Sequence, residues 1–137
     1  MDTSIAYWTR TGHSRKIAEH IGNTLKLPVH NLREGPPPRG HLVLVSGIYA
    51  GKSDPKMLNA LQALTPDTTP RLTLVITCAS PDARDADLRK ALANQGLAVD
   101  EKEHVCPGGF LFIRFTRPNQ HDLDAAAAFV KEAIKQA

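Results

Sequence analysis

Residues 5–21 read IAYWTRTGHSRKIAEHI, and this stretch decides the fold. Its first four residues are an apolar run of the kind found in a buried strand, and a polar turn that contains Gly12 follows directly. From Ile17 onward, apolar residues recur at positions i, i+1, i+4 and i+8, which is the spacing of one helix face. The stretch therefore predicts a strand that passes through a short polar turn into an amphipathic helix.

The same alternation of apolar runs and helical patterns continues along the chain. Helix starts are predicted at Asp54-Pro55, Ser80-Pro81 and Asn119, where a capping residue opens the pattern. Further strands are predicted at residues 29–32, 42–46, 72–77 and 99–105, with 110–115 as a second piece of the last strand. Buried strands joined by helices predict one α/β domain over residues 1–137, with a doubly wound, five-stranded parallel sheet and helices on both faces.

Length and composition fit a single ordinary domain. The 137 residues are 42% hydrophobic and 23% charged, and no apolar run approaches the ~20 residues that a membrane span needs. The first residues are acidic and enter a strand at once, which is not typical of a signal peptide. Cys78 and Cys106 lack metal-motif spacing, and the six histidines show no ligand pair, so we expect no metal site. These features predict a reduced, cytoplasmic protein.

The chain carries a small excess of positive charge. There are 17 basic and 14 acidic residues, a net charge of +3, which is compatible with an anionic ligand or partner. No dense Lys/Arg run and no alternation of basic and aromatic residues accompanies this charge, so we expect no nucleic-acid partner.

The turn after the first strand has the composition of a phosphate site. It consists of Thr9, Arg10, Thr11, Gly12, His13 and Ser14. The turn offers three hydroxyls, backbone N–H groups, a glycine that permits close approach, and the positive end of a helix dipole. One hydroxyl would be enough to cap the helix. The surplus favours a phosphate ligand over a simple cap.

A second ligand loop is predicted after the strand at 42–46. Residues 46–53, SGIYAGKS, nearly form a nucleotide-triphosphate P-loop, but only three residues separate Gly47 from Gly51 where that motif needs four. The strand at 72–77 also ends without the Asp that would hold Mg²⁺. We therefore interpret the segment as a glycine-flanked ligand loop with Tyr49 at its tip, with an incidental surface aromatic as the alternative.

These motifs together resemble a known family. IAYWTRTGHSRKIAEHI resembles the opening of flavodoxins and flavodoxin-like domains, in which a T/S-x-T-G-x-T/S loop wraps the phosphate of flavin mononucleotide (FMN). LVLVSGIYAGK (42–52) resembles their third strand and the loop that carries an aromatic residue against the flavin ring. VCPGGF (105–110) and TRPNQHDLDAAAAFVKEAI (116–134) resemble the end of a flavodoxin-like subgroup.

The resemblance implies an FMN-binding flavoprotein that acts in electron transport, with a redox partner protein or a planar small molecule as its counterpart. The implied cofactor contacts are the turn at 9–14, Ile48, Tyr49, Ala50 and Gly51, and Cys78, Ala79 and Ser80 on the next loop. Flavodoxins proper are acidic, whereas this chain is basic, and residues 78–84 contain no second aromatic. Two alternatives therefore stay open. One is an FMN-dependent oxidoreductase, a reductase or dehydrogenase of a quinone or tetrapyrrole, and the other is an accessory subunit without flavin.

Overall fold

The computed structural model describes residues 2–8, 12–49, 52–78, 86–107 and 118–136. The elements in chain order are β1 (Thr3–Trp8), α1 (His13–Leu25), β2 (Val29–Asn31), the 3₁₀ helix η1 (Leu32–Glu34), β3 (His41–Tyr49), β4 (Lys52–Ser53), α2 (Pro55–Leu61), β5 (Arg71–Cys78), α3 (Ala86–Asn94), β6 (Val99–Pro107) and α4 (Gln120–Lys135). Among the described residues, no helix has the length and apolar character needed to span a membrane.

Five of the strands form the predicted parallel sheet. Its order is β2-β1-β3-β5-β6, and neighbouring strands pair in parallel throughout. Strand β4 was not predicted: it pairs with the end of β3 in antiparallel fashion, Ile48 opposite Ser53 and Tyr49 opposite Lys52. A strand of two residues has no periodicity of its own, so no sequence pattern could reveal it.

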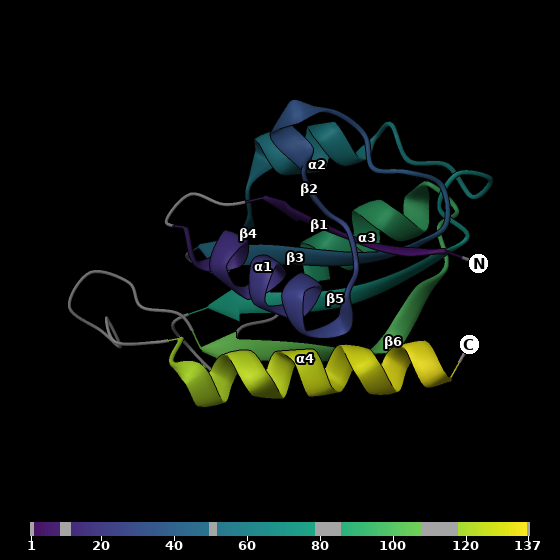
Figure 1. Cartoon of the computed structure of the whole chain (residues 1–137). Helices are drawn as coiled ribbons and strands as arrows, with labels where there is room; N and C mark the ends of the chain where they lie inside the picture. Colours follow the sequence, from purple (N-terminus) through teal and green to yellow (C-terminus); the bar gives the residue numbers. More distant parts are fainter. Residues whose placement is uncertain (1, 9–11, 50–51, 79–85, 108–117, 137) are drawn as a thin grey trace.

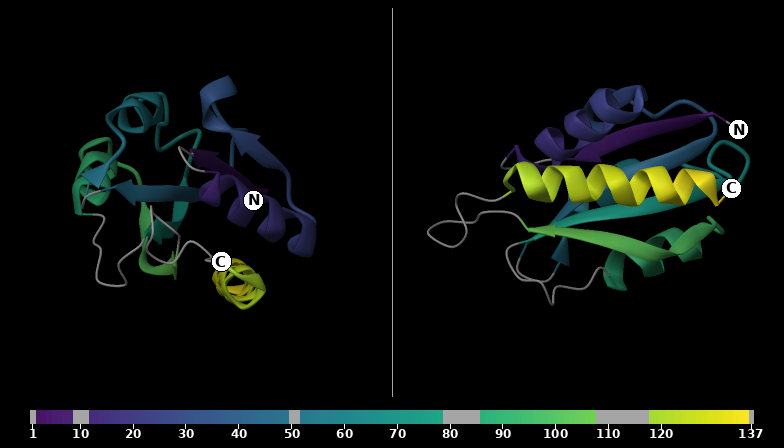
Figure 2. Two further views of the ribbon diagram at one scale, coloured as in Figure 1. Left: turned by 90° about the vertical axis from the view of Figure 1, so that its left-hand side faces the viewer. Right: turned by 60° about the horizontal axis from the view of Figure 1, so that its bottom comes forward.

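The sheet lies between two layers of helices (Figures 1 and 2). Helices α2 and α3 cover one face, where Met57, Leu61, Leu88 and Leu92 are buried among the strand side chains. Helices α1 and α4 cover the other face. The run at 42–45 alternates between the two cores, which confirms the prediction that this strand is covered on both faces.

Two predicted helix starts are confirmed by their capping geometry. The Asp54 side chain accepts a hydrogen bond from the Lys56 backbone N–H at the start of α2. At the start of α4, the side chains of Asn119 and Asp122 each accept a bond from the other's backbone N–H, which is a capping box. The start predicted at Ser80-Pro81 and the strand piece at 110–115 lie outside the described residues, within which α3 begins at Ala86.

Candidate functional site

The fold itself marks one edge of the sheet for a ligand. In the sheet, β1 lies between β2 and β3. The chain passes from β1 to β2 on one side of β1 and then crosses to β3 on its other side, so the winding direction reverses between β1 and β3. Those two strands are neighbours, with Trp8 at the end of β1 opposite Ser46. In open α/β sheets, ligands bind beyond the carboxyl ends of the strands at such a reversal. The turn into α1 and the β3–β4 hairpin both begin there.

Within the part of the chain that the structure describes, no side chain caps the start of helix α1. Its N-cap residue is Gly12, which has a φ of 90° and no side chain to accept a bond from the first-turn amides. A Cβ built on Gly12 would have no described atom within 4 Å, so the space beside this backbone is open. The first N–H groups of a helix have no intrahelical acceptor and carry the positive end of the dipole. The start of α1 can therefore receive an anion.

Ser14 in the first turn of α1 supplies a second observation. Its side chain is buried, with a relative exposure of 1%, yet Oγ has no hydrogen-bond partner in the described structure. Leaving a buried hydroxyl without a partner costs about 1–3 kcal/mol. Such a group in a native fold calls for a ligand or another explanation. A phosphate oxygen at the helix start would supply the missing partner.

His13 and Lys16 add titratable and charged groups to the same helix turn. Burial lowers the pKa of His13, and the nearby Lys16 charge lowers it further. Lys16 is exposed and donates from Nζ to the backbone oxygen of Pro118, at 3.3 Å. Because that acceptor is neutral, the positive charge of Lys16 is not cancelled there. A dianionic phosphate would oppose both effects on His13 and raise its pKa.

A cluster built on Trp8 joins the end of β1 to the start of α2. The buried indole Nε1–H donates to Asp54 Oδ2 at 3.0 Å. The Arg33 guanidinium lies over the Trp8 ring, with Cζ 4.1 Å from its centroid. Asp54 is also the cap of α2, so one buried carboxylate holds two elements. We name Trp8, Arg33 and Asp54 the Trp8 cluster. With these contacts, the Trp8 ring belongs to the core.

The hairpin that carries Tyr49 is tied to a third element. The Ser53 backbone N–H and hydroxyl donate to the two carboxylate oxygens of Asp87, at 2.9 and 3.2 Å. Asp87 lies in the first turn of α3 and also accepts from the Leu88 N–H. The β3–β4 hairpin is therefore anchored to α3, on the side of the site away from α1.

The structure describes only part of the predicted site. Of the turn at 9–14, Gly12, His13 and Ser14 are described and lie together at the start of α1. Ile48, Tyr49 and Cys78 are described as strand backbone, at the carboxyl ends of β3 and β5. Thr9, Arg10, Thr11, Ala50, Gly51, Ala79 and Ser80 lie outside the described residues. Their contacts with a cofactor stay predictions.

Two further observations concern the metal-binding side chains and the thiol of Cys106 in the part of the chain that the structure describes. Within the described ranges, no three His, Cys, Asp or Glu side chains gather in a way that would hold a metal ion. Cys106 is fully buried, and its Sγ lies 3.8 Å from the backbone oxygen of Asp122. Cys106 is therefore a small buried thiol packed in the core.

Sequence reasoning missed the Trp8 cluster and the Ser53–Asp87 contact. From the sequence, Asp54 is interpreted as a helix cap, and nothing in the pattern pairs it with Trp8. The residues of each pair lie 46 and 34 positions apart in the chain. A Trp at a strand end and a capping Asp are each common, and neither residue predicts that the other is its partner.

Comparison with solved structures identifies the fold of this chain. No family model and no curated protein matches the chain. Oxidised flavodoxin 1 from Bacillus cereus superposes with a TM-score of 0.73 at 14% identity, over 100% of this chain and 99% of that chain. A flavodoxin from the domain Archaea gives 0.68 at 15% identity, over 98% and 99%. Rubredoxin oxygen:oxidoreductase from Desulfovibrio gigas gives 0.65 at 11% identity, over 98% of this chain and 36% of that chain. The protein therefore has the flavodoxin-like fold.

Proposed function

We propose that this protein binds FMN and acts in electron transfer, with the FMN phosphate at the start of α1. The observation that carries the proposal is the hydroxyl of Ser14, which is buried in the first turn of that helix and has no hydrogen-bond partner in the described structure. Flavodoxins among the similar structures support a flavin as the ligand of this edge. The residues present fit a phosphate, since the first turn of α1 offers backbone N–H donors and the Ser14 hydroxyl.

FMN supplies reversible uptake of one or two electrons, and the protein supplies position, access and electrostatics. In the proposal, the turn at 9–14 holds the phosphate through hydroxyls and first-turn amides. Tyr49 and the segment that begins at Cys78 flank the flavin ring, with Ile48, Ala50, Gly51, Ala79 and Ser80 beside it. The Trp8 cluster fixes the strand end from which the phosphate turn departs.

The Ser14→Ala variant tests the proposal with two readouts. Loss of a hydrogen bond to a charged group should weaken FMN binding by ~1–3 kcal/mol, which is about 5–150-fold in Kd. The flavin-free protein should be as stable as the wild type or slightly more stable, because the removed hydroxyl has no protein partner. Quenching of flavin fluorescence measures Kd, and urea unfolding measures stability.

Riboflavin and a second variant serve as controls. Riboflavin lacks the phosphate, so its affinity should be low and the same for wild type and Ser14→Ala. Thr24→Ala removes a hydroxyl from the last turn of the same helix, where the side chain is exposed, and should leave the FMN affinity unchanged. Equal affinity of the wild type for FMN and riboflavin would contradict the proposal. Loss of apo stability in Ser14→Ala, with unchanged FMN affinity, would assign Ser14 a purely structural role.

A further inference from the structure

The β3–β4 hairpin is too short to hold its own position by strand pairing. Strand β4 has two residues, Lys52 and Ser53, which lie opposite Tyr49 and Ile48 at the end of β3. An isolated two-stranded hairpin is marginally stable at best in water. The place of this hairpin at the carboxyl edge of the sheet therefore depends on contacts with other elements.

One such contact comes from Asp87 in the first turn of α3. Its Oδ2 accepts the Ser53 backbone N–H at 2.9 Å, and its Oδ1 accepts the Ser53 hydroxyl at 3.2 Å and the Leu88 N–H at 2.8 Å. Ser53 is 4% exposed, and Leu88 is fully buried in the core under α3, so the contact joins two packed parts of the molecule. Because both donors of Ser53 meet one carboxylate, the contact fixes the orientation of β4 as well as its distance from α3.

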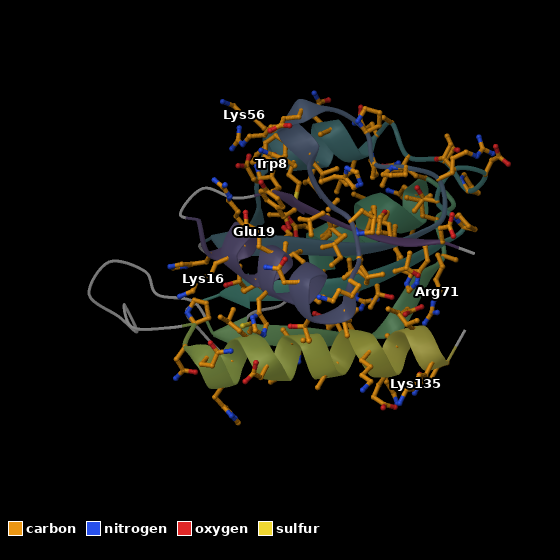
Figure 3. All side chains as sticks on the ribbon, in the orientation of Figure 1. Trp8, Lys16, Glu19, Lys56, Arg71 and Lys135 are labelled. Carbon is orange, nitrogen blue, oxygen red and sulfur yellow. The ribbon has the colours of Figure 1, made fainter. Side chains whose placement is uncertain are left out.

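The next residue along the chain, Asp54, holds the end of the hairpin from another side. Its carboxylate accepts the indole N–H of Trp8 at 3.0 Å and the Lys56 N–H at 2.9 Å. Figure 3 shows Trp8 and Lys56 near each other, where β1 ends and α2 begins. Asp54 follows β4, whereas Ser53 belongs to it. Asp87 is therefore the side chain that holds the strand of the hairpin itself.

We propose that Asp87 is a positioning residue of the flavin site, which holds the β3–β4 hairpin so that Tyr49 can stack on the ring. The inference rests on the proposed function, which sets Tyr49 beside the flavin. Aromatic stacking depends on the offset and distance of the two rings, so a loosened hairpin loses stacking even when Tyr49 is present. Helix α3 also follows the segment that begins at Cys78, the second segment set beside the ring. One carboxylate thus joins the hairpin to the helix that follows this second segment.

A double-mutant cycle of Asp87→Ala and Tyr49→Ala tests this role. Tyr49→Ala should weaken FMN binding by about 5–150-fold, the range for the loss of one base–aromatic stack. Asp87→Ala should weaken it by at least about fivefold, and the double variant by no more than Tyr49→Ala alone, because both changes remove the same interaction. FMN bound to Asp87→Ala should also be more fluorescent than FMN bound to the wild type, since quenching requires contact with the ring.

Three further variants separate hairpin geometry from charge and from stability. Asp87→Asn keeps an acceptor for the Ser53 N–H and an amide that can donate to the Ser53 hydroxyl, so the FMN affinity should stay within about twofold of the wild type. Ser53→Ala removes one of the two bonds and should give a smaller loss than Asp87→Ala. Asp67→Ala removes the same charge at a side chain that is 80% exposed, and should change nothing.

Three outcomes of these measurements would overturn the positioning role. They are additive losses in the double variant, an Asp87→Asn variant as weak as Asp87→Ala, or unchanged affinity and fluorescence in Asp87→Ala. Amide hydrogen exchange of the flavin-free protein keeps this role distinct from the proposed function. The Ser53 amide should exchange at least about tenfold faster in Asp87→Ala, because its acceptor is gone. If the wild type binds no FMN, the proposed function fails, whereas faster Ser53 exchange would still support Asp87 as the residue that holds the hairpin, and unchanged exchange would overturn it.

Discussion

The hydrogen bonding of buried polar groups differs in extent between the two ends of the sheet. At the amino end, a chain of hydrogen bonds crosses four neighbouring strands. The Thr3 hydroxyl lies 3.4 Å from His41 Nδ1, His41 Nε2 lies 2.7 Å from Thr73 Oγ1, and the Thr73 hydroxyl donates to Asp100 at 2.7 Å. Because Thr73 donates to Asp100, it accepts from His41, so the His41 proton lies on Nε2.

Arg71 completes the amino-end network. It donates twice to Asp100 and once to the backbone oxygen of Ala133 on α4, each at 2.9 Å. Only its Nη1 is left buried without a partner. At the carboxyl end, the buried hydroxyl of Ser14 in the first turn of α1 has no hydrogen-bond partner in the described structure. Among the described residues, each end thus leaves one buried donor without a partner. At the amino end that donor belongs to a guanidinium already held by three hydrogen bonds, whereas the Ser14 hydroxyl is the whole polar group of its side chain.

The largest effect is expected at the amino end. Asp100→Ala would leave Arg71 and Thr73 without their acceptor, and both side chains of the Arg71–Asp100 pair are mostly buried, at 18% and 23% exposed. We expect a loss of ~2–4 kcal/mol in the free energy of unfolding, measured with urea. The FMN affinity should stay unchanged.

Asp67→Ala is the matched control for this change. Asp67 pairs with Arg39 at the surface, with side chains 80% and 67% exposed, so its loss should cost under about 1 kcal/mol. Equal costs for the two variants would show that the amino-end network adds no stability beyond a surface pair. A tenfold change in FMN affinity in Asp100→Ala would show that the two ends are coupled.

A middle-sized effect is expected at the Trp8 cluster. Trp8→Phe removes the N–H that satisfies the buried Asp54 carboxylate, which should cost ~1–3 kcal/mol of stability. Because Trp8 ends the strand that leads into the phosphate turn, FMN binding should weaken as well. Tyr7→Phe is the control: it removes a polar group from the neighbouring residue, which packs on the opposite face of the sheet. If Trp8→Phe lowers stability and leaves the FMN affinity intact, the cluster is structural only.

The smallest effect concerns pH. Burial lowers the pKa of His13, His41 and His104 in the folded protein. A histidine whose folded pKa lies below the unfolded value of ~6.5 binds protons better in the unfolded chain, so its contribution is complete above pH ~6.5 and is lost as pH falls toward the folded pKa. Unfolding free energy should therefore fall from pH 7.5 to 5.5, by at most ~1.4 kcal/mol per pH unit for each proton taken up.

Adding FMN distinguishes the pH dependence caused by His13 at the carboxyl end from that caused by His41 at the amino end. A bound phosphate raises the pKa of His13 and should flatten the part of the pH dependence that His13 causes, so FMN binding should tighten as pH falls through this window. His13→Gln should remove the FMN-dependent part, whereas His41→Gln should remove a part that FMN does not change. Urea unfolding at a series of pH values, with and without FMN, measures both. A pH dependence that FMN leaves unaltered in the wild type would place the phosphate away from His13.

At low pH, the amino-end network should lose stability because Asp100 becomes protonated. Burial raises the pKa of this carboxyl, but hydrogen bonds from Arg71 and Thr73 and the charge of Arg71 outweigh burial and hold the pKa below its usual value. The stability that Asp100 contributes is therefore present above the unfolded pKa of about 4 and is lost as pH falls below it. This loss belongs to the amino end alone and should be absent in Asp100→Ala.

The sequence by itself determined the order of elements and much of their layout. Alternating apolar runs and helical periodicity predicted the parallel sheet and its helices, because burial of one face imposes a repeat on neighbouring residues. Capping residues predicted the starts of α2 and α4, because a cap acts within three residues along the chain. The composition of the turn at 9–14 likewise predicts an anion site, and this stays a prediction.

Only the tertiary structure decided which polar groups are satisfied. The hydroxyl of Ser14 differs from an ordinary cap because it is buried by the packing of α1 and finds no partner there. Trp8 meets Asp54, and Thr73 meets Asp100, across 46 and 27 residues of chain. Such pairs follow no period in the sequence, since the partners meet only when strands and helices pack. The pattern of neighbouring residues therefore determines the elements, whereas three-dimensional packing determines which groups stay available for a ligand.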